Sequence, residues 1–400
     1  MDYSLKDKNI ILGVCGGIAA YKSVELLRLL KKGQANVRVI MTRNALHFVG
    51  PLTFEALSGT AVCTSLFTAN DPAAIRHIDW AAAADAVVVA PATANIIGKI
   101  AGGLADDALS TFLLAVTCPV ILCPSMNTHM YENKAMQRNL QRLKADGLLV
   151  LAPESGQLAC GTTGPGRLPE PEVILDRVVS CLSPQDLKGK NILVTAGPTR
   201  EPVDPVRFMS NPSSGKMGYA VARAAQHRGA RTTLIAGPVS LADPPHVNLI
   251  RVNTAREMAS AVFDNMDRAH VIIKAAAVSD YRAKEIAAHK IKKENDEIVL
   301  SFQKNQDILK EVGRRKKHQI LVGFAAETQA LEANAVKKMT EKNLDMIVGN
   351  LVGSPDSGFH SDTNTVAFFF KDGSREALDP MEKDTIAHIL LDRIVEKFLK

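Results

Sequence analysis

The sequence opens twice in the same way, and this repetition constrains the fold more than any other feature. Residues 8–12 form a short apolar run that is followed by a glycine-bearing turn at 13–17. Residues 190–194 form a second such run, which is followed by a similar turn at 195–198. A helical pattern follows each turn. A strand, a glycine turn and a helix are the usual opening of a doubly wound parallel sheet. The chain is therefore predicted to be an α/β protein with two doubly wound, Rossmann-like domains.

Further apolar runs, separated by helical segments, extend this prediction through both halves. The predicted strands are Val37–Met41, Ala86–Ala90, Val120–Cys123 and Leu148–Leu151 in the first half, and Arg231–Ala236, Val271–Ala276, Ile320–Ala325, Met346–Gly349 and Val366–Phe370 in the second. Such alternation is typical of βαβ units, whose helices cover both faces of a parallel sheet. A helix candidate at 172–182 and a linker at 183–189 place the boundary near residue 187, which predicts domains 1–187 and 188–400.

Composition excludes several other classes of protein. With 400 residues, 46% hydrophobic and 22% charged, the chain is too apolar to be disordered and too long for one core. We find no apolar stretch fit for a membrane span and no secretory signal, so we expect a cytoplasmic protein without membrane contact. The net charge of +6 comes without a nucleic-acid motif, which favours small anionic substrates over nucleic acid. Six scattered cysteines without a C-x-x-C pair argue against a zinc site or a disulfide framework.

Open α/β sheets bind ligands beyond the carboxyl ends of their strands, so the loops there hold the candidate site residues. In the first half, Gly16 and Gly17 either let a helix N-terminus meet a phosphate or form a plain tight turn. The small polar side chains of 91–95 suit a flat cofactor or a helix cap. Asn127, after the next strand, is a ligand contact or a turn former.

One cysteine and one histidine are candidates for chemistry in this half. Cys160 differs from the other cysteines because it lies in the glycine-rich segment 156–166. A thiol on such a flap can close over a substrate, deliver a proton and exclude water. By itself, a histidine such as His77 is more often a surface or capping residue.

The second half contains a long loop that is similar to a P-loop only in part. Gly215-Lys216 fits that pattern, but Ser210 stands where the first glycine belongs and Met217 replaces the metal-binding hydroxyl residue. A Walker-type NTPase is therefore disfavoured. The loop either binds an anion at the next helix N-terminus or serves as a rigid connection. Asp280 follows a buried strand, where it can meet a ligand or a bound metal.

Lysines in the second half are candidates to hold a polyanion. Lys290 begins the basic run 290–293, which can equally be a solvated turn. Lys338 and Lys342 are four residues apart, so a helix would place both on one face. Like charges at that spacing repel each other, which suggests an anionic partner.

Together, the motifs of the first half resemble those of one known family. His77, the run 124–130 and Cys160 resemble the flavin-dependent cysteine decarboxylases, and segments 16–22 and 91–95 resemble that family's FMN-binding segments. The resemblance implies that Cys160 donates a proton, that His77 acts near the substrate in the oxidative half of the reaction and that Asn127 binds its carboxylate or amide. The residues implied for FMN are Gly16, Gly17, Thr42, Thr93, Ala94, Asn95 and Ser125.

Residues 188–400 resemble the phosphopantothenate–cysteine ligases, through the blocks 210–218, 276–281, 290–293 and 323–328. The order of the halves is similar to that of fused bacterial enzymes that join the two activities. The resemblance implies that CTP with Mg²⁺ activates 4′-phosphopantothenate as an acyl-cytidylate, that cysteine displaces CMP, and that the first half decarboxylates the product. Asn211 would hold the acyl-cytidylate and Lys290 would meet developing charge. The contacts implied for substrate and CTP are Asp280, Lys290, Asn305, Asp307, Ile308, Phe324, Lys338 and Lys342; no metal ligand is assigned.

Two departures and two alternatives accompany the resemblance. Gln306 stands where the ligases commonly have proline, which puts the rigidity of that loop in question, and Tyr131 stands where the decarboxylases often have tryptophan. The resemblance also implies a homo-oligomer with trimeric decarboxylase and dimeric ligase contacts, which a homododecamer satisfies. An FMN-binding regulatory protein and a twin-domain nicotinamide dehydrogenase remain alternatives, although the absent G-x-G-x-x-G disfavours the second.

Overall fold

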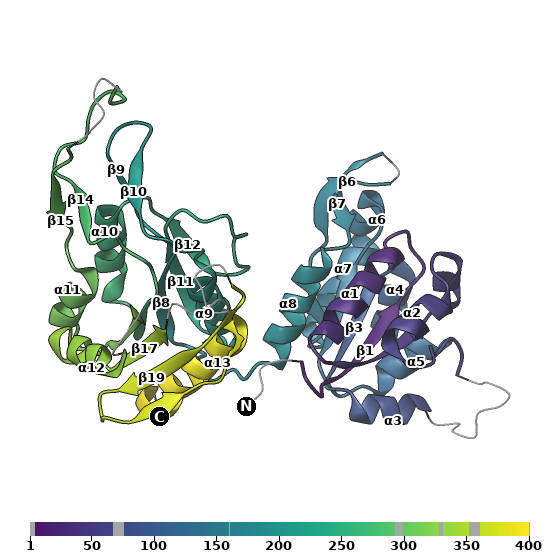
Figure 1. The fold of residues 1–400 in the computed structure, drawn as a ribbon. Helices are drawn as coiled ribbons and strands as arrows, with labels where there is room; N and C mark the ends of the chain where they lie inside the picture. Colours follow the sequence, from purple (N-terminus) through teal and green to yellow (C-terminus); the bar gives the residue numbers. More distant parts are fainter. Residues whose placement is uncertain are drawn as a thin grey trace. The chain divides into compact units, whose positions relative to one another are not determined.

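The computed structural model describes residues 5–66, 76–159, 161–292, 299–327, 331–351 and 361–399. The described chain divides into two compact units, one ending at Ser183 and the other beginning at Pro184 (Figure 1). None of the described helices is long and apolar enough to cross a membrane. Each unit is an α/β fold built around its own sheet, which confirms the predicted fold class.

The amino-terminal unit is built on a parallel sheet with the strand order β2-β1-β3-β4-β5. The strands are β1 (Asn9–Val14), β2 (Asn36–Met41), β3 (Ala86–Ala92), β4 (Val120–Pro124) and β5 (Leu149–Val150). The central strand β3 is buried along its whole length, which is why its sequence is an unbroken apolar run. The order changes direction between β1 and β3, the place where such sheets open a crevice for ligands.

Helices cover both faces of this sheet (Figure 1). One face packs against α1 (Ala20–Lys32), α2 (Pro51–Ser58) and α8 (Pro171–Leu182). The other packs against α3 (Arg76–Ala83), α4 (Ala94–Gly102), α5 (Ala108–Ala115) and α7 (Lys134–Ala145). Two short helices, η1 (Arg43–His47) and α6 (Thr128–Glu132), follow β2 and β4 at the carboxyl edge of the sheet.

A β-hairpin stands at that carboxyl edge beside α6 (Figure 1). Its antiparallel strands are β6 (Glu154–Gln157) and β7 (Thr163–Arg167). The sequence predicted this segment as a glycine-rich flap. It forms a hairpin because backbone hydrogen bonds between the two strands need no apolar side chains, and it lies outside the core.

The carboxyl-terminal unit contains a larger, mixed sheet in the order β12-β11-β8-β13-β16-β17-β19-β20. Its strands are β8 (Asn191–Ala196), β11 (Arg231–Ala236), β12 (Asn248–Arg251), β13 (Val271–Lys274), β16 (Ile320–Glu327), β17 (Met346–Leu351), β19 (Val366–Phe370) and β20 (Arg375–Ala377). In this order, the six strands from β12 to β17 pair in parallel. The strand order changes direction between β8 and β13. β19 and β20 run antiparallel at one edge.

This sheet is also covered on both faces. α9 (Lys216–His227) and α13 (Lys383–Ile394), which continues as η2 (Val395–Leu399), pack on one face. α10 (Ala255–Met266), α11 (Ile308–Arg315) and α12 (Leu331–Glu341) pack on the other. Three small antiparallel ladders complete the unit: β9 (Arg200–Pro202) with β10 (Phe208–Ser210), β14 (Tyr281–Ala283) with β15 (Phe302–Lys304), and β18 (Thr363–Asn364) with β21 (Met381–Glu382).

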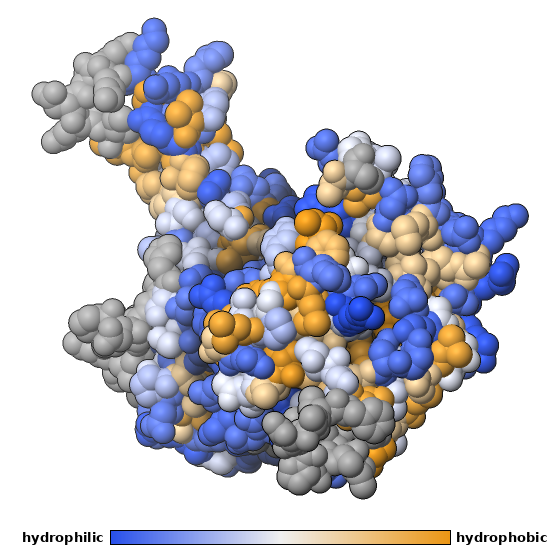
Figure 2. Space-filling view, turned by 90° about the vertical axis from the view of Figure 1, so that its right-hand side faces the viewer, coloured by the Kyte–Doolittle hydropathy of each residue, from blue (hydrophilic) through white to orange (hydrophobic). Residues whose placement is uncertain are grey.

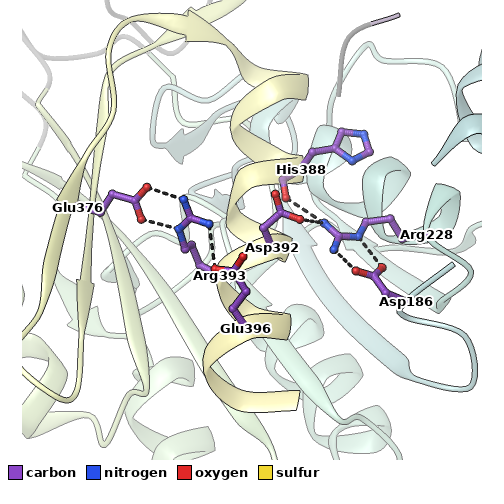
Figure 3. A network of polar contacts seen from close by, with 7 residues as sticks. All are labelled: Asp186, Arg228, Glu376, His388, Asp392, Arg393 and Glu396. Atoms are coloured by element: carbon purple, nitrogen blue, oxygen red, sulfur yellow. Dashed lines mark hydrogen bonds and ion pairs between the residues drawn. The ribbon is translucent and has the colours of Figure 1, made fainter. Parts of the chain in front are cut away.

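A buried arginine fixes the ends of α9 and α13 to each other (Figure 3). Arg228, which is 1% exposed, donates hydrogen bonds to Asp186, to Asp392 at 2.9 Å and to the carbonyl oxygen of His388 at 3.0 Å. A guanidinium at this depth is tolerated because carboxylates and a carbonyl oxygen satisfy its donors. The contact holds the carboxyl-terminal ends of both helices in place, and thereby the side-by-side course of the two helices.

Candidate active sites

A cavity of about 960 Å³ opens at the carboxyl edge of the amino-terminal sheet. It is lined by every residue predicted for the flavin: Gly16, Gly17, Thr42, Thr93, Ala94, Asn95 and Ser125. These residues follow β1, β2, β3 and β4, so four separate strand ends meet at one place. The volume lies in the upper range for ligand pockets, which suits a cofactor larger than a simple metabolite.

Three helices begin at this cavity without a side-chain cap. The N-cap residues are Ala19 for α1, Thr42 for η1 and Thr93 for α4. By contrast, the side chains of Asp107 and Asn133 cap α5 and α7. An uncapped helix N-terminus offers N–H groups and a partial positive charge to an anion. The cavity therefore fits a ligand that carries a phosphate group.

The paired glycines have different roles. A Cβ on Gly16 would lie 2.5 Å from the Cβ of Asn44 and 2.6 Å from its carbonyl carbon, so only glycine allows these two loops to meet. A Cβ on Gly17 would meet nothing nearer than Thr93 at 3.9 Å. Gly16 thus closes the wall of the cavity, while Gly17 leaves its interior open.

Lys99 and Asp107 also line the cavity, although the sequence did not single them out. The Nζ of Lys99 lies 2.6 Å from carboxylate oxygens of both Asp106 and Asp107. These two carboxylates raise the pKa of Lys99. Burial opposes the ionisation of Asp107, but the hydrogen bonds from Lys99 and Ser110 outweigh it and lower the pKa. Lys99, Asp106 and Asp107 thus place fixed charges between α4 and α5, at the wall of the cavity.

The hairpin is attached to the loop that follows β4. The carbonyl oxygen of Gly166 accepts hydrogen bonds from the N–H of Met126 at 3.0 Å and from the hydroxyl of Ser125 at 3.3 Å. A Cβ on Gly166 would lie 2.1 Å from the carbonyl oxygen of Met126. Glycine is required here because the two backbones touch.

Of the three catalytic residues predicted for this half, Asn127 is the one whose side chain the structure describes. Asn127 lines the cavity, and its Oδ1 accepts from the N–H of His129 at 2.9 Å, so it both caps α6 and faces the ligand space. Cys160 lies outside the described residues, although its neighbour Ala159 lines the cavity. His77 belongs to α3, and its side chain also lies outside the described part. Cys15, by contrast, is buried, and burial raises the pKa of its thiol to about 12, which disfavours it as a nucleophile.

A second cavity, of about 920 Å³, opens at the carboxyl edge of the carboxyl-terminal sheet. Most of the predicted ligase residues line it: Asn211, Asp280, Asn305, Asp307, Ile308, Phe324, Lys338 and Lys342. Lys290 is not among the lining residues; it lies on the segment that follows β14. Ile308 is the first residue of α11, and its side chain is almost wholly buried in the core, so it forms part of the cavity wall and offers no polar side chain.

Asn305 fixes the loop in which Gln306 replaces the usual proline. Its backbone N–H donates to the carbonyl of Asp280 at 2.8 Å, and its Nδ2 donates to the carbonyl of Ser279 at 2.9 Å. Its Oδ1 accepts from Arg282 at 2.8 Å. These bonds tie the loop to residues 279–282, which lead into β14, so the order that proline would impose is supplied by hydrogen bonds.

Lys342 directly follows α12, and its N–H donates to the carbonyl oxygen of Lys338 at 3.0 Å, as in a helical turn. Both lysines line the same cavity, as expected for side chains on one face. The Nζ of Lys342 lies 2.8 Å from the Oδ2 of Asp307, whose Oδ1 caps α11 by accepting from the N–H of Lys310 at 3.0 Å. Burial opposes the ionisation of Asp307, but Lys342 outweighs it and lowers the pKa.

Several lining residues were missed by the sequence analysis. Lys274 is the last residue of β13, and burial lowers its pKa to about 8. A cation that ends an apolar run at a strand's carboxyl end is a signal that could have identified it. Asn350, Asn364 and Lys383 also line the cavity without having been predicted, and so does Lys216, which was noted only for its likeness to a P-loop. The described residues contain no group of three His, Cys, Asp or Glu side chains fit to hold a metal.

Family models match both halves of the chain. Residues 2–183 match the family described as Flavoprotein, and residues 187–398 match the one described as DNA/pantothenate metabolism flavoprotein C-terminal domain.

Full-length relatives match the same order of domains. The coenzyme A biosynthesis bifunctional protein CoaBC of Bacillus subtilis (strain 168) is 49% identical over 394 residues, covering 98% of this chain and 97% of that protein. The protein of the same name from Escherichia coli (strain K12) is 48% identical over 401 residues, covering 99% and 98%. The crystal structure of the C-terminal domain of a CoaBC protein shares 43% identity, with a TM-score of 0.46, over 52% of this chain and 96% of that one.

Proposed function

The chain belongs to the family of coenzyme A biosynthesis bifunctional proteins, and from this membership we propose how its two cavities divide the family's chemistry. It is a bifunctional enzyme, a phosphopantothenate–cysteine ligase and a phosphopantothenoylcysteine decarboxylase, and its decarboxylase half is an FMN-dependent flavoprotein. A regulatory flavin-binding protein and a nicotinamide dehydrogenase are thereby no longer alternatives. We assign residues 1–187 to the decarboxylase and residues 188–400 to the ligase. The observation that supports this division is the presence of one cavity per sheet, each at the change of strand order.

In the amino-terminal cavity, the uncapped starts of α1, η1 and α4 would hold the FMN phosphate and the polar edge of its ring. When bound, FMN supplies the two-electron chemistry that gives the substrate an electron sink for loss of CO₂. Asn127 would orient the substrate through its Nδ2, because its Oδ1 is used in capping α6. The hairpin would exclude water, and Cys160 would deliver the proton that replaces CO₂ on the substrate carbon. His77 is assigned to the substrate's thiol side.

In the carboxyl-terminal cavity, a carboxylate oxygen of 4′-phosphopantothenate would attack the α-phosphorus of CTP and release pyrophosphate. The amine of cysteine would then attack the acyl carbon and release CMP. Lys338 and Lys342 would meet the triphosphate with its Mg²⁺, and Phe324, Asn305 and Asp307 would border the nucleotide. The Nδ2 of Asn211 donates to the carbonyl of Val278 at 3.1 Å, which would aim its Oδ1 at the acyl-cytidylate.

We propose that both units associate with further copies of the chain. The rim of the flavin cavity includes Ile18 and Tyr21, which are 65% and 62% exposed, and apolar surface gathers in the middle of the face seen in Figure 2. In the other unit, Phe208, Tyr281 and Phe302 are exposed on the ladders β9–β10 and β14–β15. Apolar surface of this kind favours protein contacts. Lys290, on the segment after β14, would reach a triphosphate if that segment closes or if a paired copy delivers it.

The test uses the purified full-length chain. We expect flavin absorbance and, on addition of phosphopantothenate, cysteine, CTP and Mg²⁺, release of pyrophosphate, CMP and CO₂. Cys160→Ser is expected to lower formation of 4′-phosphopantetheine by roughly a hundredfold or more while leaving pyrophosphate release unchanged. Pyrophosphate release with ATP in place of CTP at equal rate would overturn the nucleotide assignment, and full decarboxylation by Cys160→Ser would overturn the role of that thiol.

A further inference from the structure

The side chain of Asp204 is buried, although it lies in the turn between β9 and β10. Its carboxylate has no exposed surface, whereas the guanidinium of Arg207, with which it pairs, belongs to a side chain that is 40% exposed. Burying a carboxylate is costly unless hydrogen bonds and an opposite charge compensate it. Burial opposes the ionisation of Asp204, but the hydrogen bonds from Arg207 and from backbone N–H groups outweigh it and lower the pKa. Asp204 is therefore charged at neutral pH.

One oxygen of this carboxylate shapes the turn itself. The Oδ1 of Asp204 accepts from the N–H of Val206 at 2.8 Å and from the N–H of Arg207 at 2.7 Å. The N–H of Val203 closes the turn by donating to the carbonyl oxygen of Arg207 at 2.9 Å. Aspartate often forms turns in this way, by accepting from N–H groups two or three residues ahead, so the turn accounts for Oδ1.

The other oxygen holds a segment that lies 87 residues later in the chain. The Oδ2 of Asp204 accepts from the N–H of Ile291 at 3.2 Å and from the Nε of Arg207 at 2.9 Å. The Nη2 of Arg207 in turn donates to the carbonyl oxygen of Ile291 at 2.9 Å. Both backbone groups of Ile291 are thus bound by one ion pair, which a turn by itself does not require.

The same segment is attached to the turn at a second point. β14 lies beside β9 (Figure 1), and after β14 the N–H of Ala287 donates to the carbonyl oxygen of Val203 at 3.1 Å. Lys290 directly precedes Ile291 and is exposed. A long side chain on an untethered segment samples many positions, whereas a fixed backbone limits the region that its ammonium group reaches. The pair of Asp204 with Arg207 therefore fixes the point from which Lys290 extends.

We propose that Asp204 is a positioning residue of the ligase, which sets the place of Lys290 through Ile291 for the step that releases pyrophosphate. This inference rests on the proposed function, in which Lys290 meets charge that develops on the triphosphate. A cation that is already in place stabilises such charge more than one that must first be ordered. The same turn leads through β10 to Asn211, so one carboxylate supports two segments assigned to this chemistry.

The test is a double-mutant cycle in the full-length chain, measured as the kcat of pyrophosphate release from phosphopantothenate, CTP and Mg²⁺. Asp204→Asn keeps an oxygen for the turn but loses the charge and the acceptor for Ile291, and kcat should fall roughly tenfold to a hundredfold. Lys290→Met should lower kcat by roughly a hundredfold or more. The double variant should match Lys290→Met within about twofold, because a lysine that is absent cannot be misplaced.

Two further variants separate positioning from a loss of folding. The matched control is Glu201→Gln, because Glu201 is a buried carboxylate of β9 whose Oε1 accepts from the N–H of Ala255 at 2.8 Å, at the start of α10. Any effect of this variant on kcat should multiply with that of Lys290→Met. Arg207→Lys keeps a cation but lacks the forked donors, and it should reproduce the effect of Asp204→Asn in milder form, even if Asp204→Asn does not fold.

Amide hydrogen exchange adds a readout that is independent of catalysis. In Asp204→Asn, residues 284–292 should exchange roughly tenfold faster, whereas Glu201→Gln should leave their exchange unchanged. Effects of Asp204→Asn and Lys290→Met that multiply in the double variant would show a structural role only and overturn the inference. Wild-type kcat in Lys290→Met would overturn it too and leave the ligase function standing. A wild-type chain that releases no pyrophosphate would instead refute the ligase proposal, and faster exchange in Asp204→Asn would still establish the attachment.

Discussion

Gly313 in α11 touches the carbonyl oxygen of Lys342, so closely that a Cβ at Gly313 would lie 1.9 Å from that oxygen. Across the same contact, the Nδ2 of Asn343 donates to the carbonyl of Gly313 at 3.0 Å. At the start of the same helix, Asp307 holds the Nζ of Lys342 at 2.8 Å. Helix α11 therefore fixes Lys342 at two points, its backbone and its ammonium group.

Gly313→Ala tests the backbone contact. The added methyl group forces α11 away from Lys342, which we expect to destabilise the ligase unit by about 1–3 kcal/mol and to raise the KM for CTP. Denaturant unfolding and ligase kinetics measure the two effects, and CO₂ release from supplied substrate should not change. Gly98→Ala in α4 is the matched control, because its Cβ would meet nothing nearer than 3.9 Å. An unaltered KM for CTP in Gly313→Ala would show that Lys342 does not contact the nucleotide.

Asp307→Asn separates the two roles of Asp307. Asparagine caps a helix as well as aspartate does, so only the ion pair with Lys342 is lost. That pair is partly exposed, and the free energy of unfolding should change by less than about 1 kcal/mol. The KM for CTP should still rise severalfold, because Lys342 loses the group that orients it. Asp307→Ala removes the cap as well and should cost about 1 kcal/mol more; equal stability of the two variants would argue against the cap.

The sequence predicted correctly those elements whose structure depends only on residues close to them in the chain. The apolar run of β3 and the glycine turn after β1 depend on burial and backbone freedom within a few residues, and both lie where predicted. The direction of β19 could not be predicted, because an apolar run is equally suited to parallel and antiparallel pairing. Lys342 follows α12 directly and lines the cavity with Lys338, but its contacts with Gly313 and Asp307, which belong to another helix and its cap, could not be predicted.

The site residues also divide into those that local sequence predicts and those that depend on long-range contacts. Residues directly after strands, such as Thr93 and Asp280, could be predicted because every parallel strand delivers its following loop to one edge of the sheet. Lys383 could not, since it begins the last long helix and reaches the cavity only through the β18–β21 pairing and the packing of α13 on α9. A lysine at a helix start carries no sequence signal for such long-range contacts.

The buried ammonium group of Lys274 should make the ligase activity depend on pH. Its pKa is lowered to about 8, because burial, reinforced by Lys342, outweighs the opposing effect of Asp307 and Asp280. As pH rises through 8, the free enzyme loses this cation, so kcat/KM for CTP should fall on the alkaline side with an apparent pKa near 8. Initial rates at low CTP between pH 6.5 and 9.5 measure it.

Two variants of Lys274 identify the group. Lys274→Arg keeps its charge over this range, so the alkaline fall should disappear. Lys274→Met should lower kcat/KM for CTP at pH 7 and leave it nearly independent of pH. If Lys274→Arg retains the alkaline fall, another group controls it.

The close backbone contact at Gly166 should be required for the hairpin to support decarboxylation. A Cβ at this position would lie 2.1 Å from the carbonyl oxygen of Met126, and φ at Gly166 is +149°, so alanine is excluded by contact and strained in its backbone. Gly166→Ala should push β7 away from Ser125, break the hydrogen bond from Met126 and displace the flap that carries Cys160. We expect CO₂ release to fall at least about tenfold, as expected where a flap must close over the substrate, while pyrophosphate release by the ligase half stays unchanged. The flavin absorbance spectrum reports whether FMN is retained. A Gly166→Ala enzyme with wild-type decarboxylation would show that the hairpin need not rest on the loop after β4.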